Sequence, residues 1–319
     1  MPFSLFQRIR RHAAIAGGKF EVLFREINMV PLEPAAVRLI EELNKPEAGM
    51  EEIAGLIGSM PEISTRILKT VNSSLFALRS PVLSIRHAVS LLGLDHVRAV
   101  ALSYVTVNSV PRPAEEIFNH KAFWGDSLVR ALVARGLASH YCPQYLDDAF
   151  TAMLIADVAL PVLLTKWTEY YRPVVQEWME GDRRLSQIEN SHFGWNHAQA
   201  GAWILQTWNF PEQLVCFVGI HNSDPQLIDE LQLEGTIALP LMVASLLPAS
   251  LHQQEGRTGN FLHRVHATMG IAPAELERIL FAAEQGFLDI CSLMGLDRPE
   301  TIPALESVRM AMTQTDAVQ

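Results

Sequence analysis

Apolar residues recur at helical spacing along nearly the whole chain. Two successive stripes with three- and four-residue steps are Ile53, Leu56, Ile57, Met60 and Ile63, Ile67, Leu68, Val71. This spacing places the apolar side chains on one face of an amphipathic helix. The alternation of a half-buried strand has one candidate, SYVTVNSV, and its place after a capped helix favours continuation of that helix. The chain is therefore predicted to be all-α.

Capping residues mark where several of these helices should begin and end. Ser84 can cap a helix that Gly93 ends, because a hydroxyl accepts from a free helix N–H and glycine tolerates the turn that follows. Asn196 has Gln199 three residues later, which is a loose capping-box spacing. The motif SQIE, residues 186–189, has the stricter spacing and predicts a second helix start.

One acidic residue interrupts the most apolar stretch of the chain. In DDAFTAMLIADVALPVLL, residues 147–164, Asp157 is flanked by apolar residues. The stretch predicts a buried helix that Pro161 kinks or ends. A buried ionised carboxylate is costly unless a cation or hydrogen-bond donors satisfy it. Asp157 is therefore the first candidate for a functional residue.

The composition of the 319-residue chain narrows the class of protein. Hydrophobic residues make up 49% and charged residues 19%, which is typical of a globular protein. The net charge of -10 argues against a surface that binds nucleic acid or anionic lipid as a whole. Three cysteines far apart form no disulfide framework, and no uncharged apolar stretch of about 18 residues is found. We therefore expect a cytoplasmic protein without a membrane span.

Residues 84–107 offer a different function. A helix, a glycine-containing turn and a second helix have the outline of a helix-turn-helix, in which His96, Arg98 and Ser103 would face a DNA groove. However, the second helix is apolar on most of its circumference, which favours a helical hairpin in the core. The basic cluster RIRRH at residues 8–12 is typical of a solvated helix face. Nucleic acid is therefore not expected as a partner, although a nucleic-acid-binding regulator remains an alternative.

Four aromatic residues lie close together between Asp157 and the SQIE motif. They are Trp167, Tyr170, Tyr171 and Trp178. Aromatic residues anchor many protein interfaces, and they are also common in cores. Both interpretations stay open at this point.

Five stretches, in the same order, resemble the HDOD domain, a bacterial relative of the HD phosphohydrolases. They span residues 29–78, 82–102 (VLSIRHAVSLLGLDHVRAVAL), 123–138 (FWGDSLVRALVARGLA), 147–164 and 194–223. The resemblance implies an HDOD-type all-helical domain. The expected parts are an N-terminal helical extension (1–19), the HDOD domain (20–235) with an N-terminal helical part (20–112) and an HD-like bundle (113–235), and a C-terminal helical region (236–319).

The resemblance also implies a damaged metal site. In HD enzymes a His-Asp dyad and further histidines hold one or two metal ions that activate a water molecule. Asp157 matches the aspartate of the dyad, but Ala156 stands in place of its histidine. Asp126 stands where an earlier ligand histidine is expected.

Two later histidines complete the comparison with the HD ligand set. His197 and His221 match family histidines, and Asn222 replaces the second member of the last pair. The candidate metal ligands are therefore Asp126, Asp157, His197 and His221, in a vestigial pocket that could still bind a divalent ion weakly.

The resulting hypothesis is a non-catalytic regulatory protein that acts through protein contacts in bacterial signal transduction. The resemblance implies partners such as a sensor kinase, a receiver protein or a cyclic-dinucleotide enzyme, and a homo-oligomer stays open. No cofactor is predicted apart from a weakly bound divalent ion. The alternative is a metal-dependent phosphohydrolase acting on nucleotides or cyclic dinucleotides, which requires the four candidate ligands to converge around an ion.

Overall fold

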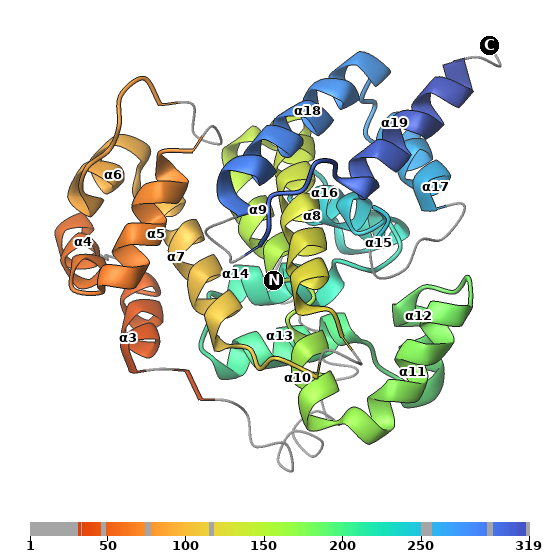
Figure 1. Cartoon of the computed structure of the whole chain (residues 1–319), viewed down its shortest axis with the longest axis horizontal. Coiled ribbons are helices and arrows are strands. Elements are labelled where there is room, and N and C mark those ends of the chain that lie inside the picture. The colour runs from red at the N-terminus through yellow and green to blue at the C-terminus, as the bar shows by residue number, and fades with distance from the viewer. Residues whose placement is uncertain are drawn as a thin grey trace.

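The computed structural model describes residues 31–32, 34–45, 49–73, 78–114, 118–249, 257–291 and 296–316. All regular elements in these ranges are helices, which confirms the all-α prediction (Figure 1). The predicted extension at residues 1–19, with its basic cluster at 8–12, lies outside the described residues.

Five helices form the N-terminal part, which lies to one side of the other helices in Figure 1. They are α3 (Pro34–Leu43), α4 (Met50–Gly58), α5 (Pro61–Val71), α6 (Ile85–Leu92) and α7 (Leu94–Ser109). Ile53, Ile57 and Ile67 of the two predicted stripes are fully buried. The Ser84 hydroxyl accepts a hydrogen bond from the His87 amide at 3.1 Å, and Gly93 follows α6 with φ of 88°, as predicted.

Helix α7 gives no support to the helix-turn-helix alternative. Val97, Ala101 and Leu102 are fully buried, and Ser103 is buried with its hydroxyl bonded to the Ala99 carbonyl. A recognition helix has to expose a face to the groove. The pair α6 and α7 is instead a hairpin within the core.

The HD-like bundle is built around the long helix α8. Its elements are α8 (His120–Tyr141), η2 (Pro143–Tyr145), α9 (Leu146–Leu154), α10 (Ala159–Lys166), α11 (Thr168–Glu180), α12 (Leu185–Phe193), α13 (His197–Thr207) and α14 (Glu212–Ile220). Asn196 and Gln199 form the predicted capping box at the start of α13.

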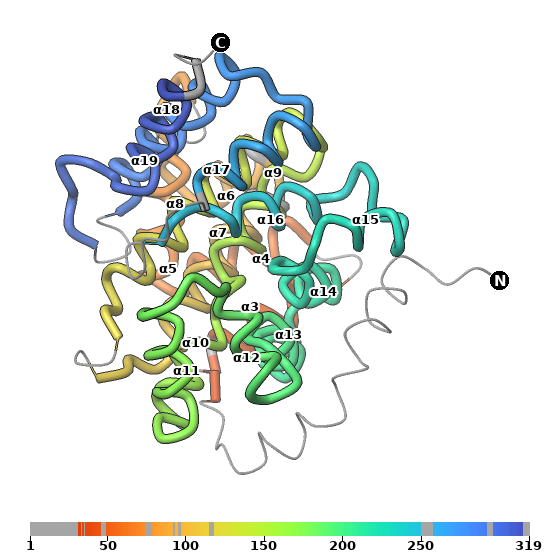
Figure 2. The backbone as a smooth tube through the Cα atoms, turned by 90° about the vertical axis from the view of Figure 1, so that its right-hand side faces the viewer, coloured from red at the N-terminus to blue at the C-terminus, as the bar shows by residue number. Residues whose placement is uncertain are grey.

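The C-terminal region packs on the same bundle. After α15 (Gln226–Leu231), the last helix of the bundle, it contains α16 (Ala238–Ala244), α17 (Arg257–His263), the π-helical turn η3 (Arg264–Thr268), α18 (Pro273–Ile290) and α19 (Pro303–Asp316). Helices α16 and α18 both contact α8, so these parts share one core (Figures 1 and 2). The predicted boundary at residues 235 and 236 stays a prediction.

The single helix predicted over residues 147–164 is wrong, because Asp157 lies in a turn between two helices. Helix α9 ends at Leu154, and α10 begins at Ala159. Pro161 has no N–H to donate to the carbonyl of Asp157 four residues earlier, and its ring would clash with that carbonyl in a continuous helix. The Leu160 amide donates to this carbonyl instead, at 2.9 Å. The proline thus interrupts the helix at the candidate residue.

The segment Pro143–Lys166 is long and apolar enough to span a membrane by length and composition alone. However, 89% of its most apolar window is buried within the protein. It comprises η2, α9 and α10, which belong to the core of the bundle. Burial in the core of the bundle therefore accounts for the apolar composition of this segment.

Close packing of α18 on α8 makes Gly136 sensitive to substitution. A Cβ atom at Gly136 would lie 2.5 Å from Cγ2 of Ile279, a buried residue with little rotamer freedom. Gly136→Ala should lower the free energy of unfolding by about 1–3 kcal/mol through overpacking. Gly125→Ala is the matched control on α8, since its Cβ meets nothing within 4 Å. The free energy of unfolding of the control, measured with urea, should rise by up to about 1 kcal/mol, because alanine has a higher helix propensity than glycine. Equal effects at both glycines would contradict the α8–α18 packing.

Candidate functional site

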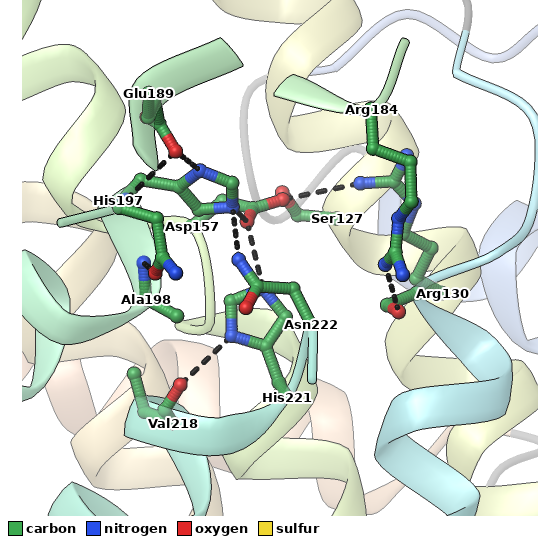
Figure 3. A network of polar contacts seen from close by, with 12 residues as sticks. Ser127, Arg130, Asp157, Arg184, Glu189, His197, Ala198, Val218, His221 and Asn222 are labelled. Atoms are coloured by element: carbon green, nitrogen blue, oxygen red, sulfur yellow. Dashed lines mark hydrogen bonds and ion pairs between the residues drawn. The ribbon is translucent and has the colours of Figure 1, made fainter. Parts of the chain in front are cut away.

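Asp157 interacts with three cationic or donor groups from three other segments (Figure 3). Nε2 of His197 lies 3.3 Å and Nε2 of His221 lies 3.2 Å from its Oδ1 atom. Nη1 of Arg130 donates to its Oδ2 atom at 3.1 Å. Burial by itself would raise the pKa of Asp157, but the hydrogen bonds from His197 and His221 outweigh it and hold the pKa well below its ordinary value. The buried carboxylate is therefore ionised.

Each partner of Asp157 is held by a further backbone or helix contact. Arg130 projects from α8, and its Nη2 donates to the Leu247 carbonyl at 3.3 Å. His221 directly follows α14, and its Nδ1 lies 2.8 Å from the Val218 carbonyl. His197 is the first residue of α13, which the Asn196 cap fixes. The orientations of the three side chains are thus set by the bundle.

Glu189 is a residue of the site that the sequence interpretation missed. The capping box predicted for SQIE is wrong, because α12 begins at Leu185, where Gln187 accepts from the Arg184 amide. Glu189 is instead inside the helix and 0% exposed. Its Oε2 atom accepts from the amide of His197 at 2.9 Å and from Nδ1 of the same residue at 2.6 Å.

His197 consequently lies between two carboxylates. Burial would lower its pKa, but the charges and hydrogen bonds of Glu189 and Asp157 raise the pKa to about 10. Both ring nitrogens then carry protons and donate to these carboxylates. Nδ2 of Asn222 lies 3.2 Å from Nε2 of the same ring, and because both atoms are donors in this protonation state, this is a contact and not a hydrogen bond.

Tyr171 adds a neutral donor to this network. Its hydroxyl donates a hydrogen bond to Oε1 of Glu189. Burial, and then the charge of Glu189, raises the pKa of Tyr171 well above its ordinary value, so the phenol stays protonated. Of the four aromatic residues, Tyr171 and Trp178 are core residues, Trp167 is half-buried against the core, and Tyr170 is exposed.

A small cavity of about 60 Å³ adjoins Asp157. Arg130, Arg184, His197 and His221 line it together with Asp126. The structure therefore brings Asp157, His197 and His221 together, with ligand atoms within 4.8 Å of one another, and places Asp126 on the same cavity but outside that group. Whether any of the four binds a metal stays a prediction.

The residues around Asp157 do not fit a divalent ion in this arrangement. Three donor groups converge, which is the number of protein ligands at a catalytic zinc site, but positive charges of the protein already contact the carboxylate. The Arg130 guanidinium holds Oδ2 of Asp157, and the imidazole of His197 is protonated. A metal ion would have to displace one positive charge and repel the other. In this arrangement the guanidinium of Arg130 donates to one oxygen of Asp157, and the two imidazoles lie beside the other.

These features define an all-helical protein with an HD-like pocket whose central carboxylate is neutralised by protein cations. The model of the HDOD domain family matches residues 29–223. The chain belongs to the HDOD domain family.

A relative in sequence and several solved structures are similar to this chain. An uncharacterized protein of Treponema pallidum (strain Nichols) is 24% identical over 224 residues, which are 69% of this chain and 43% of that protein. The chain thus spans less than half the length of this relative.

Three solved structures share the fold at low identity. A Shewanella amazonensis SB2B protein whose name suggests a phosphohydrolase is 20% identical, with a TM-score of 0.66 over 85% of this chain and 97% of that chain. An HDOD domain protein of unknown function from Geobacter sulfurreducens is 19% identical, with a TM-score of 0.59 over 83% and 91%. A Marinobacter aquaeolei VT8 protein whose name suggests signal transduction is 19% identical, with a TM-score of 0.62 over 86% and 61%.

Removing the charge of Glu189 should destabilise the protein strongly. Glu189→Gln leaves the His197 imidazolium with a weaker partner in a buried place, which should cost about 3 kcal/mol. Glu177→Gln is the matched control, because Glu177 pairs with His192 at 2.8 Å on the surface, with both side chains about 40% exposed. The control should lose no more than about 1 kcal/mol. Urea unfolding measures both, and equal losses would contradict a buried network.

The pKa of His197 also predicts a dependence of stability on pH. Folding raises this pKa from 6.5 to about 10, so the stabilisation is complete below the unfolded pKa and is lost as pH rises through about 10. The difference in unfolding free energy between wild type and Glu189→Gln should therefore narrow from neutral pH toward about pH 10. A difference that widens over this range in parallel urea titrations would show that the sign is wrong.

Proposed function

We propose that this HDOD protein is a non-hydrolytic regulator that acts through contacts with other proteins in signal transduction. The observation that carries the proposal is the 3.1 Å contact between the Arg130 guanidinium and Oδ2 of Asp157. Metal-assisted hydrolysis needs an ion with an open position that holds a water molecule. A fixed guanidinium satisfies the carboxylate but has no such position.

The dyad supports the same proposal. Ala156 offers no ligand atom, so the only side chain of the dyad that could bind an ion is Asp157. Both oxygens of that carboxylate already accept from Arg130, His197 or His221. We infer that the pocket has a structural role, and that the helices around it are the functional surface.

The partners that we propose are a sensor kinase, a receiver protein or a cyclic-dinucleotide enzyme in the cytoplasm. Membership of the HDOD family supports this proposal, and so does the name of the Marinobacter aquaeolei neighbour, which suggests signal transduction. The described helices contain no strand-based receiver fold, so an input would come from another protein or from a small ligand.

A metal-dependent phosphohydrolase is the second candidate, because one contact favours it. The Glu189–His197 pair resembles the carboxylate–histidine pairs that orient metal ligands. The name of the Shewanella amazonensis neighbour suggests the same chemistry. This candidate requires that an ion displaces Arg130 from Asp157.

The two candidates differ in metal content and turnover. Wild-type protein incubated with Mn²⁺ and then desalted should retain substoichiometric metal and should not cleave bis-(p-nitrophenyl) phosphate, a nucleotide or a cyclic dinucleotide. Arg130→Ala should increase the affinity for Mn²⁺ by about tenfold or more, because it removes a positive charge from Oδ2 of Asp157. Arg184→Ala is the control, since Arg184 lines the same cavity but bonds Ser245.

Each outcome decides between the candidates. Stoichiometric Mn²⁺ in the wild type, with turnover that Asp157→Ala abolishes, would overturn the proposal in favour of the hydrolase. An equal gain of affinity in both arginine variants would show that Arg130 has no special place beside Asp157. Circular dichroism confirms that each variant is folded before its affinity is compared.

A further inference from the structure

A second cavity lies between the N-terminal helices and the bundle. Its volume is about 140 Å³, and it shares no lining residue with the cavity beside Asp157. An apolar cavity of about 150 Å³ is large enough to bind benzene. The second cavity therefore has room for an aromatic ring or a short acyl chain.

The floor of this cavity is apolar and buried. It is formed by Val100 on α7, Phe150 and Leu154 on α9, and Ile290 on α18. These residues come from the N-terminal part, the bundle and the C-terminal region. A ligand with an apolar body would thus be desolvated against three parts of the chain at once.

The rim of the cavity is basic. Arg66 on α5 holds its guanidinium over the Tyr104 ring, 5.0 Å from the centroid. Arg112, which follows α7, also lines the cavity and is exposed. Among the described residues, neither arginine has a carboxylate within ion-pair distance. Glu62 on α5 accepts a hydrogen bond from the hydroxyl of the lining residue Tyr104 at 3.3 Å.

His120 completes the rim without adding charge. Its Nε2 atom accepts a hydrogen bond from the indole N–H of Trp124 at 3.0 Å, which requires an unprotonated nitrogen. Burial and the charge of Arg112 lower its pKa. The rim thus offers two cations to a ligand, with a neutral imidazole beside them.

The geometry points to a binding site for a small amphipathic anion, with its apolar body on Val100, Phe150 and Leu154 and a carboxylate or phosphate head between Arg66 and Arg112. Apolar cavities with a few convergent polar groups are the usual form of small-molecule sites. This inference goes beyond the proposed function and does not depend on the pocket at Asp157. A small molecule bound in this cavity would contact the N-terminal part and the bundle at the same time.

Three probes with the same phenyl group test this site by titration calorimetry on the full chain. Phenylacetate and phenyl phosphate carry the anionic head, and 2-phenylethanol is the neutral control. At least one anion should bind saturably, and 2-phenylethanol should bind about tenfold more weakly, because it cannot pair with the arginines. Binding of the anion should weaken as salt is added.

Matched variants locate the binding in the cavity. Arg66→Gln and Arg112→Gln should each weaken binding of the anion by about fivefold or more. Val107→Phe enlarges a half-buried lining residue and should block both anions. Arg79→Gln removes the same charge from an exposed residue that does not line the cavity, so it should leave the affinity unchanged.

The outcomes are distinct. Binding of phenylacetate alone would identify a carboxylate head, and binding of phenyl phosphate alone a phosphate head; both support the site. No saturable binding of either anion would overturn it. The site would also be overturned if Arg66→Gln, Arg112→Gln and Val107→Phe all bound the anion with wild-type affinity. Each variant must have the circular dichroism spectrum of the wild type for this comparison. Equal affinity for 2-phenylethanol would overturn the assignment of an anion.

Discussion

The ionised carboxylate of Asp157 is the group on which the arrangement of the pocket depends. It lies where α8, the turn after α9, the start of α13 and the end of α14 meet. An unpaired charge in such a place costs several kcal/mol, so each segment must hold its donor toward the carboxylate. Replacing a buried ion pair by apolar residues is often neutral or stabilising. We therefore interpret the network as fixing the relative positions of the helices more than as a source of stability.

Glu189 extends this constraint to two more helices. By accepting from His197 and Tyr171, it connects the start of α13 with α12 and α11. His197 is shared between Glu189 and Asp157, so the two carboxylates are coupled through one imidazolium. In an HD enzyme a metal ion holds the dyad carboxylate. In this chain, Arg130 and His197 provide the positive charge, and the helices can keep the same arrangement.

The sequence predicts the helices better than it predicts the pocket. The helical stripes at 53–60 and 63–71, the Ser84 cap and the Asn196 cap are local patterns, and the structure contains each of them. The apolar neighbours of Asp157 identify it in the sequence as a candidate functional residue. Arg130 and Glu189 were missed, because nothing in their local sequence distinguishes a buried ion-pair partner from a solvated residue of an amphipathic helix. Their role arises from contacts with residues 27 and 8 positions away. Glu189 in particular fitted a capping box, and only the start of α12 at Leu185 shows that it lies within the helix.

Helix α9 connects the two cavities of the protein. Phe150 and Leu154 form part of the floor of the basic-rimmed cavity, and the turn that begins directly after Leu154 contains Asp157. Pro161 prevents α9 from continuing through this turn, so α9 and α10 are two separate helices on either side of Asp157. A ligand on the floor of the second cavity would contact α7 and the C-terminal half of α9, and the turn that follows this same end of α9 carries Asp157, which contacts His197 of α13 and His221 after α14. Coupling between two sites requires an element whose position both sites bias. In this fold α9 is the helix that adjoins both cavities, because its residues line one of them and it ends at the charged turn of the other.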